Sequence, residues 1–171
     1  DDDDDDDDDG EVADEVSVAD SPSLPSPWHL DAMGLPVSTA SYGAWTVAVL
    51  ESGLASVPGL SSSPIVAPFD PIDDDDDPED GHQHGTHVAS LVASTHPDAP
   101  GVAPGVALMP VRVLDDDNCG FEIDLVEGIY HAVDSGADVL NMSLSFPLGY
   151  TPSPALAEAL EYAHTAGVVM V

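Results

Sequence analysis

The sequence predicts an α/β fold with a mostly parallel sheet and helices on both of its faces. Short β-branched apolar runs, typical of buried strands, recur along the chain, and helix-type runs lie between them. Strands that alternate with helices favour βαβ units, in which helices connect parallel strands. The 171 residues, 43% of them hydrophobic, suffice for one domain with a core.

The chain is expected to consist of an acidic linker over residues 1–25 and a folded part over residues 26–171. The linker begins with nine consecutive Asp residues, which repel one another, and continues into a Ser/Pro-rich stretch that cannot build a core. We therefore expect it to be disordered. A calcium-binding tail is the alternative, although polyaspartate offers oxygen ligands without a fixed cage.

The first half of the folded part is predicted to hold three strands and a helix. Residues 45–50 (WTVAVL) are typical of a strand buried on both faces, and residues 64–68 (PIVAP) suggest a second short strand. Residues 84–96 (HGTHVASLVASTH) are rich in Ala, Val and Leu and favour a helix. Residues 106–114 (VALMPVRVL) favour a strand again.

The second half continues the alternation. Residues 122–137 predict a helix that Gly136 ends, and residues 138–144 and 167–171 predict strands. Between these strands, Ser153 is the expected N-cap of another helix. Because a doubly wound domain normally covers such a last strand with a helix, we expect the fold to be incomplete at the C-terminus. The apolar stripe of the helix predicted over 122–137 consists of Val126, Ile129, Tyr130 and Val133.

The charge of the chain excludes several partners. The sequence has 34 acidic residues and one basic residue, Arg112, and its formal net charge is −33. Such a surface has no cations to offer phosphates or anionic lipids, so neither nucleic acid nor an anionic membrane is an expected partner. No apolar run approaches the about 20 residues of a membrane span. The single cysteine, Cys119, excludes an intrachain disulfide.

A carboxylate and an imidazole are placed for hydrolytic chemistry. Glu51 closes the first predicted strand and His84 opens the next predicted helix, and functional groups gather at the carboxyl ends of parallel strands. A carboxylate that orients one ring nitrogen leaves the other to accept a nucleophile's proton. A zinc site with His82 and His87 is the alternative, but their spacing differs from the His-Glu-x-x-His pattern of zinc proteases, and no metal ligands are predicted.

Five motifs resemble those of one family, the subtilisin-like serine peptidases (subtilases). They occur in the family's order and extend from about Trp28 to Val171. The resemblance implies a subtilisin-like three-layer fold, an extracellular or cell-surface location, and cleavage of peptide bonds through a serine acyl-enzyme. The motifs are VAVLESG (47–53), HGTHVAS (84–90), PVRVLDDDNCG (110–120), ADVLNMSLS (137–145) and AGVVMV (166–171).

The resemblance assigns roles to individual residues. Glu51 matches the acid that orients the catalytic imidazole, and His84 matches the general base. The family binds its polypeptide substrate in an extended conformation between two segments, which implies main-chain hydrogen bonds as in strand addition. The residues that match these substrate-binding segments are Leu114, Gly120, Ser143, Leu144 and Ser145.

The chain also departs from the family. The family has Asp where this chain has Glu51, which adds about 1.5 Å of reach, so a retuned triad and an impaired site both remain open. Ser90 replaces the usual Gly. The sequence contains neither the Gly-Thr-Ser-Met-Ala type motif of the nucleophile nor the oxyanion asparagine. We therefore expect the chain by itself to be inactive.

No cofactor is required for this chemistry, but many subtilases bind calcium. The acid run DPIDDDDDPEDG (70–81) offers oxygen ligands at short spacing, and a calcium loop and a solvated loop both remain open. The sequence thus supports two functions: the N-terminal part of a subtilase endopeptidase, or a degenerate module that binds extended peptides or calcium. The candidate calcium ligands are Asp73, Asp74, Asp75, Asp76 and Asp77.

Overall fold

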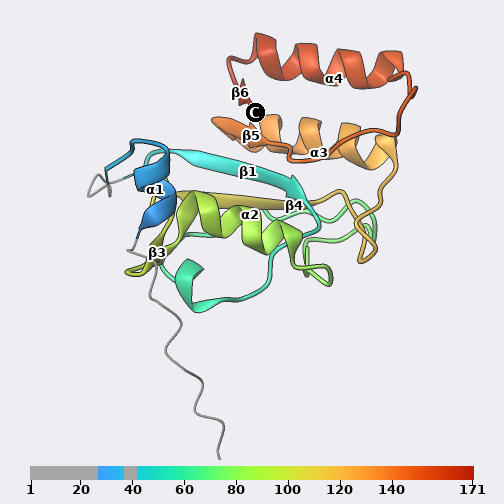
Figure 1. Cartoon of the computed structure of the whole chain (residues 1–171). Coiled ribbons are helices and arrows are strands. Elements are labelled where there is room, and N and C mark those ends of the chain that lie inside the picture. Colours follow the sequence, from blue (N-terminus) through green and yellow to red (C-terminus); the bar gives the residue numbers. More distant parts are fainter. Residues whose placement is uncertain (1–26, 37–41) are drawn as a thin grey trace, which may run out of the picture.

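Four parallel strands form the central sheet. The computed structural model describes residues 27–36 and 42–171, so the expected linker over residues 1–25 lies outside the described residues. The strand order is β4-β1-β5-β6, and each neighbouring pair is parallel, as the sequence predicts (Figure 1). The strands are β1 (Thr46–Glu51), β4 (Ala107–Arg112), β5 (Val139–Asn141) and β6 (Val169–Met170).

Helices cover both faces of this sheet, which confirms the predicted three-layer α/β fold. The helices α3 (Glu122–Asp134) and α4 (Pro154–Thr165) lie together on one face, and α2 (His84–Ala93) lies on the other (Figure 1). The alternation of side chains along β1 explains the two cores. Leu50 packs with residues of α3 and α4, whereas Val49 packs with residues of α2.

Small elements flank the α2 side of the sheet. They are α1 (Trp28–Ala32), the 3-10 helix η1 (Pro58–Leu60), and the antiparallel pair β2 (Thr95–His96) and β3 (Ala99–Pro100). The His29 side chain on α1 is hydrogen-bonded through Nε2 to the Pro100 carbonyl at 2.7 Å. This bond attaches α1 to the β2–β3 hairpin.

The strands predicted over 138–144 and 167–171 are shorter, as β5 and β6, and two other predicted elements also differ in extent or type. Residues 64–68 do not form a strand, and only single bridges join Ile65 and Phe69 to β4. The two prolines of this segment lack N–H donors and therefore cannot sustain a ladder of hydrogen bonds. The helix predicted over 84–96 ends at Ala93, because the next residues pair in the β2–β3 hairpin instead.

The N-cap predicted for α4 and the glycine predicted to end the helix before it are confirmed. Ser153 Oγ accepts a hydrogen bond from the Leu156 backbone N–H at 3.3 Å and so caps α4. Gly136 and Gly167 adopt positive φ angles of 85° and 83° just beyond α3 and α4, a conformation in which a side chain is disfavoured.

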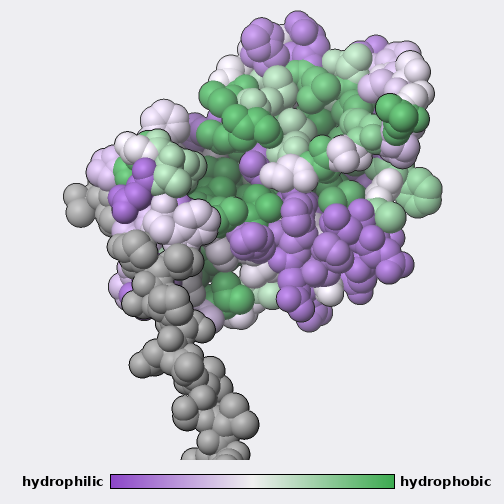
Figure 2. All heavy atoms as spheres, viewed as in Figure 1, coloured by the Kyte–Doolittle hydropathy of each residue, from purple (hydrophilic) through white to green (hydrophobic). Residues whose placement is uncertain are grey.

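The surface is divided between acidic loops and an apolar region. Figure 2 shows hydrophilic residues gathered over the loops of the acid run, and apolar residues around β5 and β6. A groove of about 380 Å³ between α2 and the sheet is lined by apolar residues that include Leu91, Val139 and Val171. Within the described residues, no helix combines the length and apolar character that crossing a bilayer requires.

Candidate active site

The structure brings Glu51 and His84 together, as the sequence predicts. Glu51 is the last residue of β1 and His84 is the first residue of α2. His84 Nδ1 lies 2.7 Å from Glu51 Oε2, within the range of a charge-assisted hydrogen bond. The longer side chain of Glu therefore reaches the imidazole from the position where the family has Asp.

Close backbone packing at Gly85 makes this contact possible. A Cβ atom at this position would lie 2.2 Å from the Gly53 carbonyl oxygen and 3.1 Å from the Glu51 Cβ atom. Only glycine lets the start of α2 approach the end of β1 this closely. The Gly after His84 in the motif thus has a steric reason, independent of any resemblance.

Burial dominates the electrostatics of Glu51. The side chain is 0% exposed, and this burial raises the pKa of Glu51 above its usual value. The hydrogen bond and charge of His84, and to a lesser extent the Ser143 backbone, lower the pKa in part, whereas the charge of Asp80 raises it further. Glu51 Oε1 is buried without a hydrogen-bond partner among the described residues.

The pair can carry out general-base chemistry. With Nδ1 donating to the Glu51 carboxylate, the ring nitrogen Nε2 of His84 is left as the acceptor for a proton. The His84 side chain is 34% exposed, so this nitrogen is accessible to a reacting group, whereas Glu51 is shielded from water. A buried orienting acid and an accessible base are what proton abstraction from a hydroxyl requires.

The site includes a second buried carboxylate that the sequence did not single out. Asp80 is the last acid of the run, yet it is only 7% exposed, so a solvated loop, one of the two alternatives for this run, does not describe this position. It accepts hydrogen bonds from Ser52, Thr86 and the backbone of the turn before α2. The bond from the His82 N–H, two residues on, is the kind that Asp forms in turns, and this local tendency of Asp is the signal that the sequence offers.

Burial is the largest influence on Asp80 and opposes its ionisation. The hydrogen bonds from Thr86, Ser52 and Gln83 together outweigh burial and lower the pKa of Asp80 below its usual value. Asp80 therefore stays ionised beside the Glu51–His84 pair.

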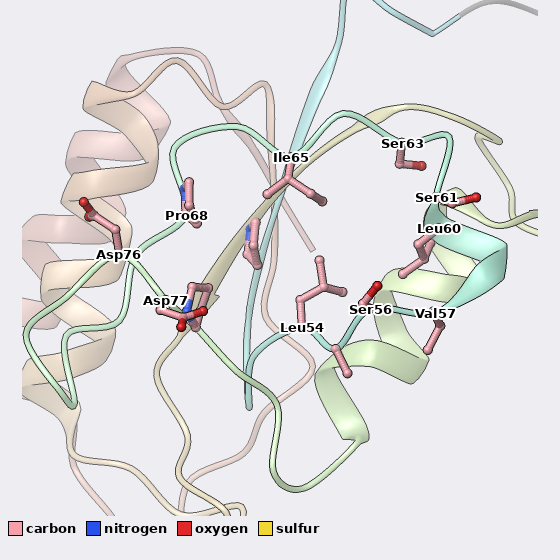
Figure 3. Close-up of a pocket in the computed structure, with 13 residues that line it drawn as sticks. Leu54, Ser56, Val57, Leu60, Ser61, Ser63, Ile65, Pro68, Asp76 and Asp77 are labelled. Carbon is pink, nitrogen blue, oxygen red and sulfur yellow. The ribbon is translucent and has the colours of Figure 1, made fainter.

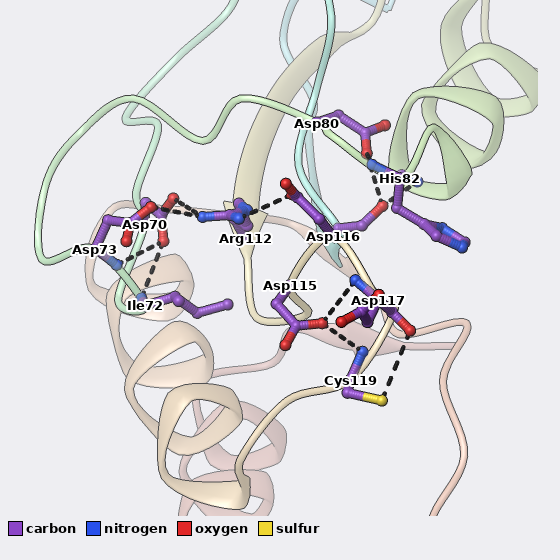
Figure 4. A network of polar contacts seen from close by, with 12 residues as sticks. Asp70, Ile72, Asp73, Asp80, His82, Arg112, Asp115, Asp116, Asp117 and Cys119 are labelled. Atoms are coloured by element: carbon purple, nitrogen blue, oxygen red, sulfur yellow. Dashed lines mark hydrogen bonds and ion pairs between the residues drawn. The ribbon is translucent and has the colours of Figure 1, made fainter.

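The one arginine of the chain organises the rest of the acid run. Arg112, at the end of β4, binds Asp70 at 2.9 Å, Asp73 at 2.8 Å and Asp116 at 3.1 Å (Figure 4). Burial is the largest influence on the pKa of Arg112 and lowers it, but the hydrogen bonds and charges of these carboxylates outweigh burial and raise the pKa above its usual range. The cluster ties the acid run to the loop that follows β4.

The candidate calcium loop does not form a ready metal cage. Asp73 to Asp77 are exposed, and among the described residues no group of three or more His, Cys, Asp or Glu side chains is placed to hold a metal ion. Arg112 already binds Asp73. The three histidines near residue 84 also form no metal site there, since His84 is bonded to Glu51.

Most of the predicted substrate-binding residues lie around one cavity. A cavity of about 200 Å³ is lined by residues from the loop after β4 and the segment after β5, and Cys119 also lines it. Ser143 lies apart from this cavity, on the groove beside α2, and its hydroxyl donates to Asn141 Oδ1 at 3.0 Å. The predicted residues that line the cavity are Leu114, Gly120, Leu144 and Ser145.

A separate pocket of about 350 Å³ lies between the loop after β1 and the acid run. Figure 3 shows its apolar side chains, among them Leu54 and Ile65, and two carboxylates, those of Asp76 and Asp77. None of the predicted catalytic or substrate-binding residues lines this pocket, but two of the candidate calcium ligands, Asp76 and Asp77, do.

Together, the parallel α/β sheet and its strand-end carboxylate bonded to a helix-start imidazole define a hydrolase-type site. The sequence profile of the Subtilase family (Peptidase_S8) matches residues 43–171. The chain belongs to this family of serine peptidases.

Individual relatives agree with the profile. The chain is 34% identical over 128 residues to the thermophilic serine proteinase of Bacillus sp. (strain AK1), covering 73% of the chain and 31% of that protein. It is 38% identical over 112 residues to the minor extracellular protease Vpr of Bacillus subtilis (strain 168), covering 60% of the chain and 14% of that protein. Among solved structures, it is similar to fervidolysin from Fervidobacterium pennivorans, a keratinolytic enzyme related to subtilisin. That match has a TM-score of 0.71 at 31% identity and covers 84% of the chain and 23% of fervidolysin. The chain thus spans less than half the length of each of these relatives.

Proposed function

We propose that residues 26–171 form the N-terminal part of a subtilase catalytic domain, and that the complete protein is a serine endopeptidase. The observation that carries this proposal is the 2.7 Å contact between His84 Nδ1 and Glu51 Oε2. It supplies the orienting acid and the general base of a catalytic triad. The chain spans 31% of the AK1 proteinase. We assign the nucleophilic serine and the oxyanion donor to the part of the relatives' catalytic domain that the match to this chain does not cover.

In the proposed reaction, His84 Nε2 takes the proton of the serine hydroxyl as the serine attacks the peptide carbonyl. Glu51 holds the imidazole in the required tautomer and stabilises the imidazolium that forms. His84 then gives the proton to the leaving amine. The reaction requires no cofactor, and calcium binding at the acid run is a separate prediction.

We assign the substrate to the cavity between the loop after β4 and the segment after β5. Leu114 and Gly120 form one wall, and Leu144 and Ser145 form the other. An extended polypeptide between two such segments can form main-chain hydrogen bonds to both. An extracellular location is supported by the minor extracellular protease Vpr, which is similar over 112 residues.

A serine-directed probe on the complete protein tests the proposal. The wild-type protein is expected to react with a fluorophosphonate probe and to hydrolyse an unstructured polypeptide. A His84→Ala variant is expected to lose both properties, whereas Glu127→Gln, an exposed change on α3, keeps them. A wild-type protein that binds an unstructured polypeptide without labelling or hydrolysis would instead be the degenerate peptide-binding module.

A further inference from the structure

Asp80 is the most heavily hydrogen-bonded side chain near the candidate active site. Its Oδ1 accepts from Ser52 Oγ at 2.9 Å and from two backbone N–H groups, those of His82 at 3.1 Å and Gln83 at 2.7 Å. Its Oδ2 accepts from the Thr86 N–H at 2.8 Å and from the Thr86 hydroxyl. A carboxylate with five donors and only 7% exposure is built into the protein rather than left on its surface.

The donors belong to the two segments that carry the Glu51–His84 pair. Ser52 directly follows Glu51, and Gln83 and Thr86 lie on either side of His84. Ser52 Oγ also accepts a hydrogen bond from the Gly85 N–H at 2.9 Å. Asp80 is therefore bonded to the end of β1 and to the start of α2 at once, and any shift between them must break at least one of these bonds.

The backbone directly before His84 needs such support. Gln83 precedes α2 with a φ of 78° and a ψ of −7°, in the left-handed region that residues other than glycine rarely adopt. A conformation of this kind persists only where its surroundings hold it. The short bond from the Gln83 N–H to Asp80 Oδ1 holds this residue in place, and with it the starting direction of α2.

We propose that Asp80 is a positioning residue that holds the His84 imidazole at hydrogen-bonding distance from Glu51. It touches neither the imidazole nor a reacting group, so it acts through the backbone on either side of them. The kinetic part of this inference rests on the proposed peptidase function, whereas its structural part does not.

Two substitutions separate positioning from charge. Asp80→Asn removes the charge, keeps Oδ1 for its three donors and lets the amide donate to the Thr86 hydroxyl, so that of the five bonds only the one from the Thr86 N–H is lost. Asp80→Ala removes all five bonds. If bonds rather than charge position His84, the Asn variant is expected to rescue what the Ala variant loses. Asp31→Ala is the matched control, because it removes an exposed Asp on α1.

The first measurement needs no peptidase activity. The His84 Nδ1–H proton is expected to give a downfield proton NMR resonance in the complete protein, assigned by its absence in His84→Ala. Asp80→Ala should broaden or abolish this resonance, while Asp80→Asn and Asp31→Ala should keep it. Ser52→Ala, which removes one donor to Asp80, serves as a milder disturbance should Asp80→Ala fail to fold, and it should broaden the resonance.

The second measurement is steady-state kinetics on the complete protein. A misplacement of about 1 Å costs on the order of 10²-fold, so kcat should fall about 100-fold in Asp80→Ala with little change in KM, and less than about 10-fold in Asp80→Asn. A wild-type resonance and kcat in Asp80→Ala would overturn the inference, as would equal losses in the Asn and Ala variants. If the wild type hydrolyses nothing, the proposed function fails, and the resonance alone still decides the role of Asp80.

Discussion

Two buried carboxylates lie side by side at this site, and their surroundings are opposite. Glu51 is 0% exposed, and one of its oxygens has no partner in the part of the chain that the structure describes, whereas Asp80 is 7% exposed and accepts five hydrogen bonds. Burial raises the pKa of Glu51, but for Asp80 the donors outweigh burial and lower the pKa. Burial acts against ionisation at both positions, and the hydrogen bonds outweigh it at Asp80 but not at the more deeply buried Glu51.

This difference matches the two roles that we propose, a catalytic one for Glu51 and a positioning one for Asp80. Glu51 forms its one strong hydrogen bond with an imidazole that must gain and lose a proton in the proposed reaction. Asp80 accepts all of its hydrogen bonds from backbone N–H and hydroxyl groups, which do not titrate near neutral pH. Removing the charge should therefore impair activity at Glu51, while at Asp80 the loss of the bonds should matter more.

The largest effect is expected for Glu51→Gln. The variant keeps the shape of the side chain but cannot stabilise the imidazolium or select the tautomer of His84. We expect kcat/KM of the complete protein to fall about 10⁴-fold, as for removal of the orienting carboxylate in other triads. Peptide hydrolysis kinetics measure this, with Glu127→Gln as the control. A loss below tenfold would contradict the role assigned to Glu51.

The next largest effect is expected at a third buried carboxylate, which is paired with a cation. Asp70 is 1% exposed and is bonded to Arg112 at 2.9 Å. Replacing Arg112 by Met leaves this charge buried without its cation, which is expected to lower the free energy of unfolding by about 3–5 kcal/mol. Urea denaturation of the variant measures this loss.

Two further variants sharpen that result. Asp73 bonds to the same guanidinium, but its side chain is 66% exposed, so Asp73→Asn should cost at most about 1 kcal/mol. Adding Asp70→Asn to Arg112→Met should restore part of the lost stability, because the buried charge is then gone. Equal costs for Arg112→Met and Asp73→Asn would show that burial does not set the strength of this cluster.

The two site carboxylates should respond to pH with opposite signs. Asp80 has a lowered pKa, so its contribution to stability is present above its unfolded pKa of about 3.8 and is lost as the pH falls through its folded pKa. Glu51 has a raised pKa, so the folded state binds the extra proton above pH 4.5, and its contribution weakens as the pH rises.

Urea unfolding between pH 3 and 6 tests this contrast. The stability of Glu51→Gln relative to wild type should rise as the pH increases above about 4.5. The stability of Asp80→Asn relative to wild type should fall as the pH increases toward about 3.8 and then level off. Slopes of the same sign for both variants would rule out opposite pKa shifts.

The sequence predicted one of these carboxylates and missed the others for a physical reason. Glu51 stands at the end of an apolar run, so local pattern alone places it at the edge of a sheet. Asp80 and Asp70 stand in an acid run that reads as solvated, and their partners Ser52 and Arg112 lie 28 and 42 residues away. Only the folded chain brings such partners together.

The secondary structure shows the same division between features that follow from local sequence and features that depend on distant residues. Most strands and helices follow from apolar runs and caps, which are local. The segment over residues 64–68 reads as a strand but forms only single bridges to β4, because its prolines remove the N–H groups that a ladder needs. The end of α2 at Ala93 depends on the β2–β3 pairing, whereas Pro97 signals only that the helix must stop nearby.

The smallest effect is expected where a carboxylate has neither burial nor a partner cation. Asp74 is exposed in the middle of the acid run and has a φ of 58°, a conformation that Asn adopts as readily as Asp. In calcium-free buffer, Asp74→Asn should change the free energy of unfolding by less than about 0.5 kcal/mol. Calorimetric titration with calcium extends the comparison to the open question of the acid run. Heat that appears with the wild type and disappears with Asp74→Asn would make this run a calcium site, and its carboxylates would then not be freely solvated. No heat at millimolar calcium would leave them as surface charges, in contrast to the buried groups at positions 51, 70 and 80.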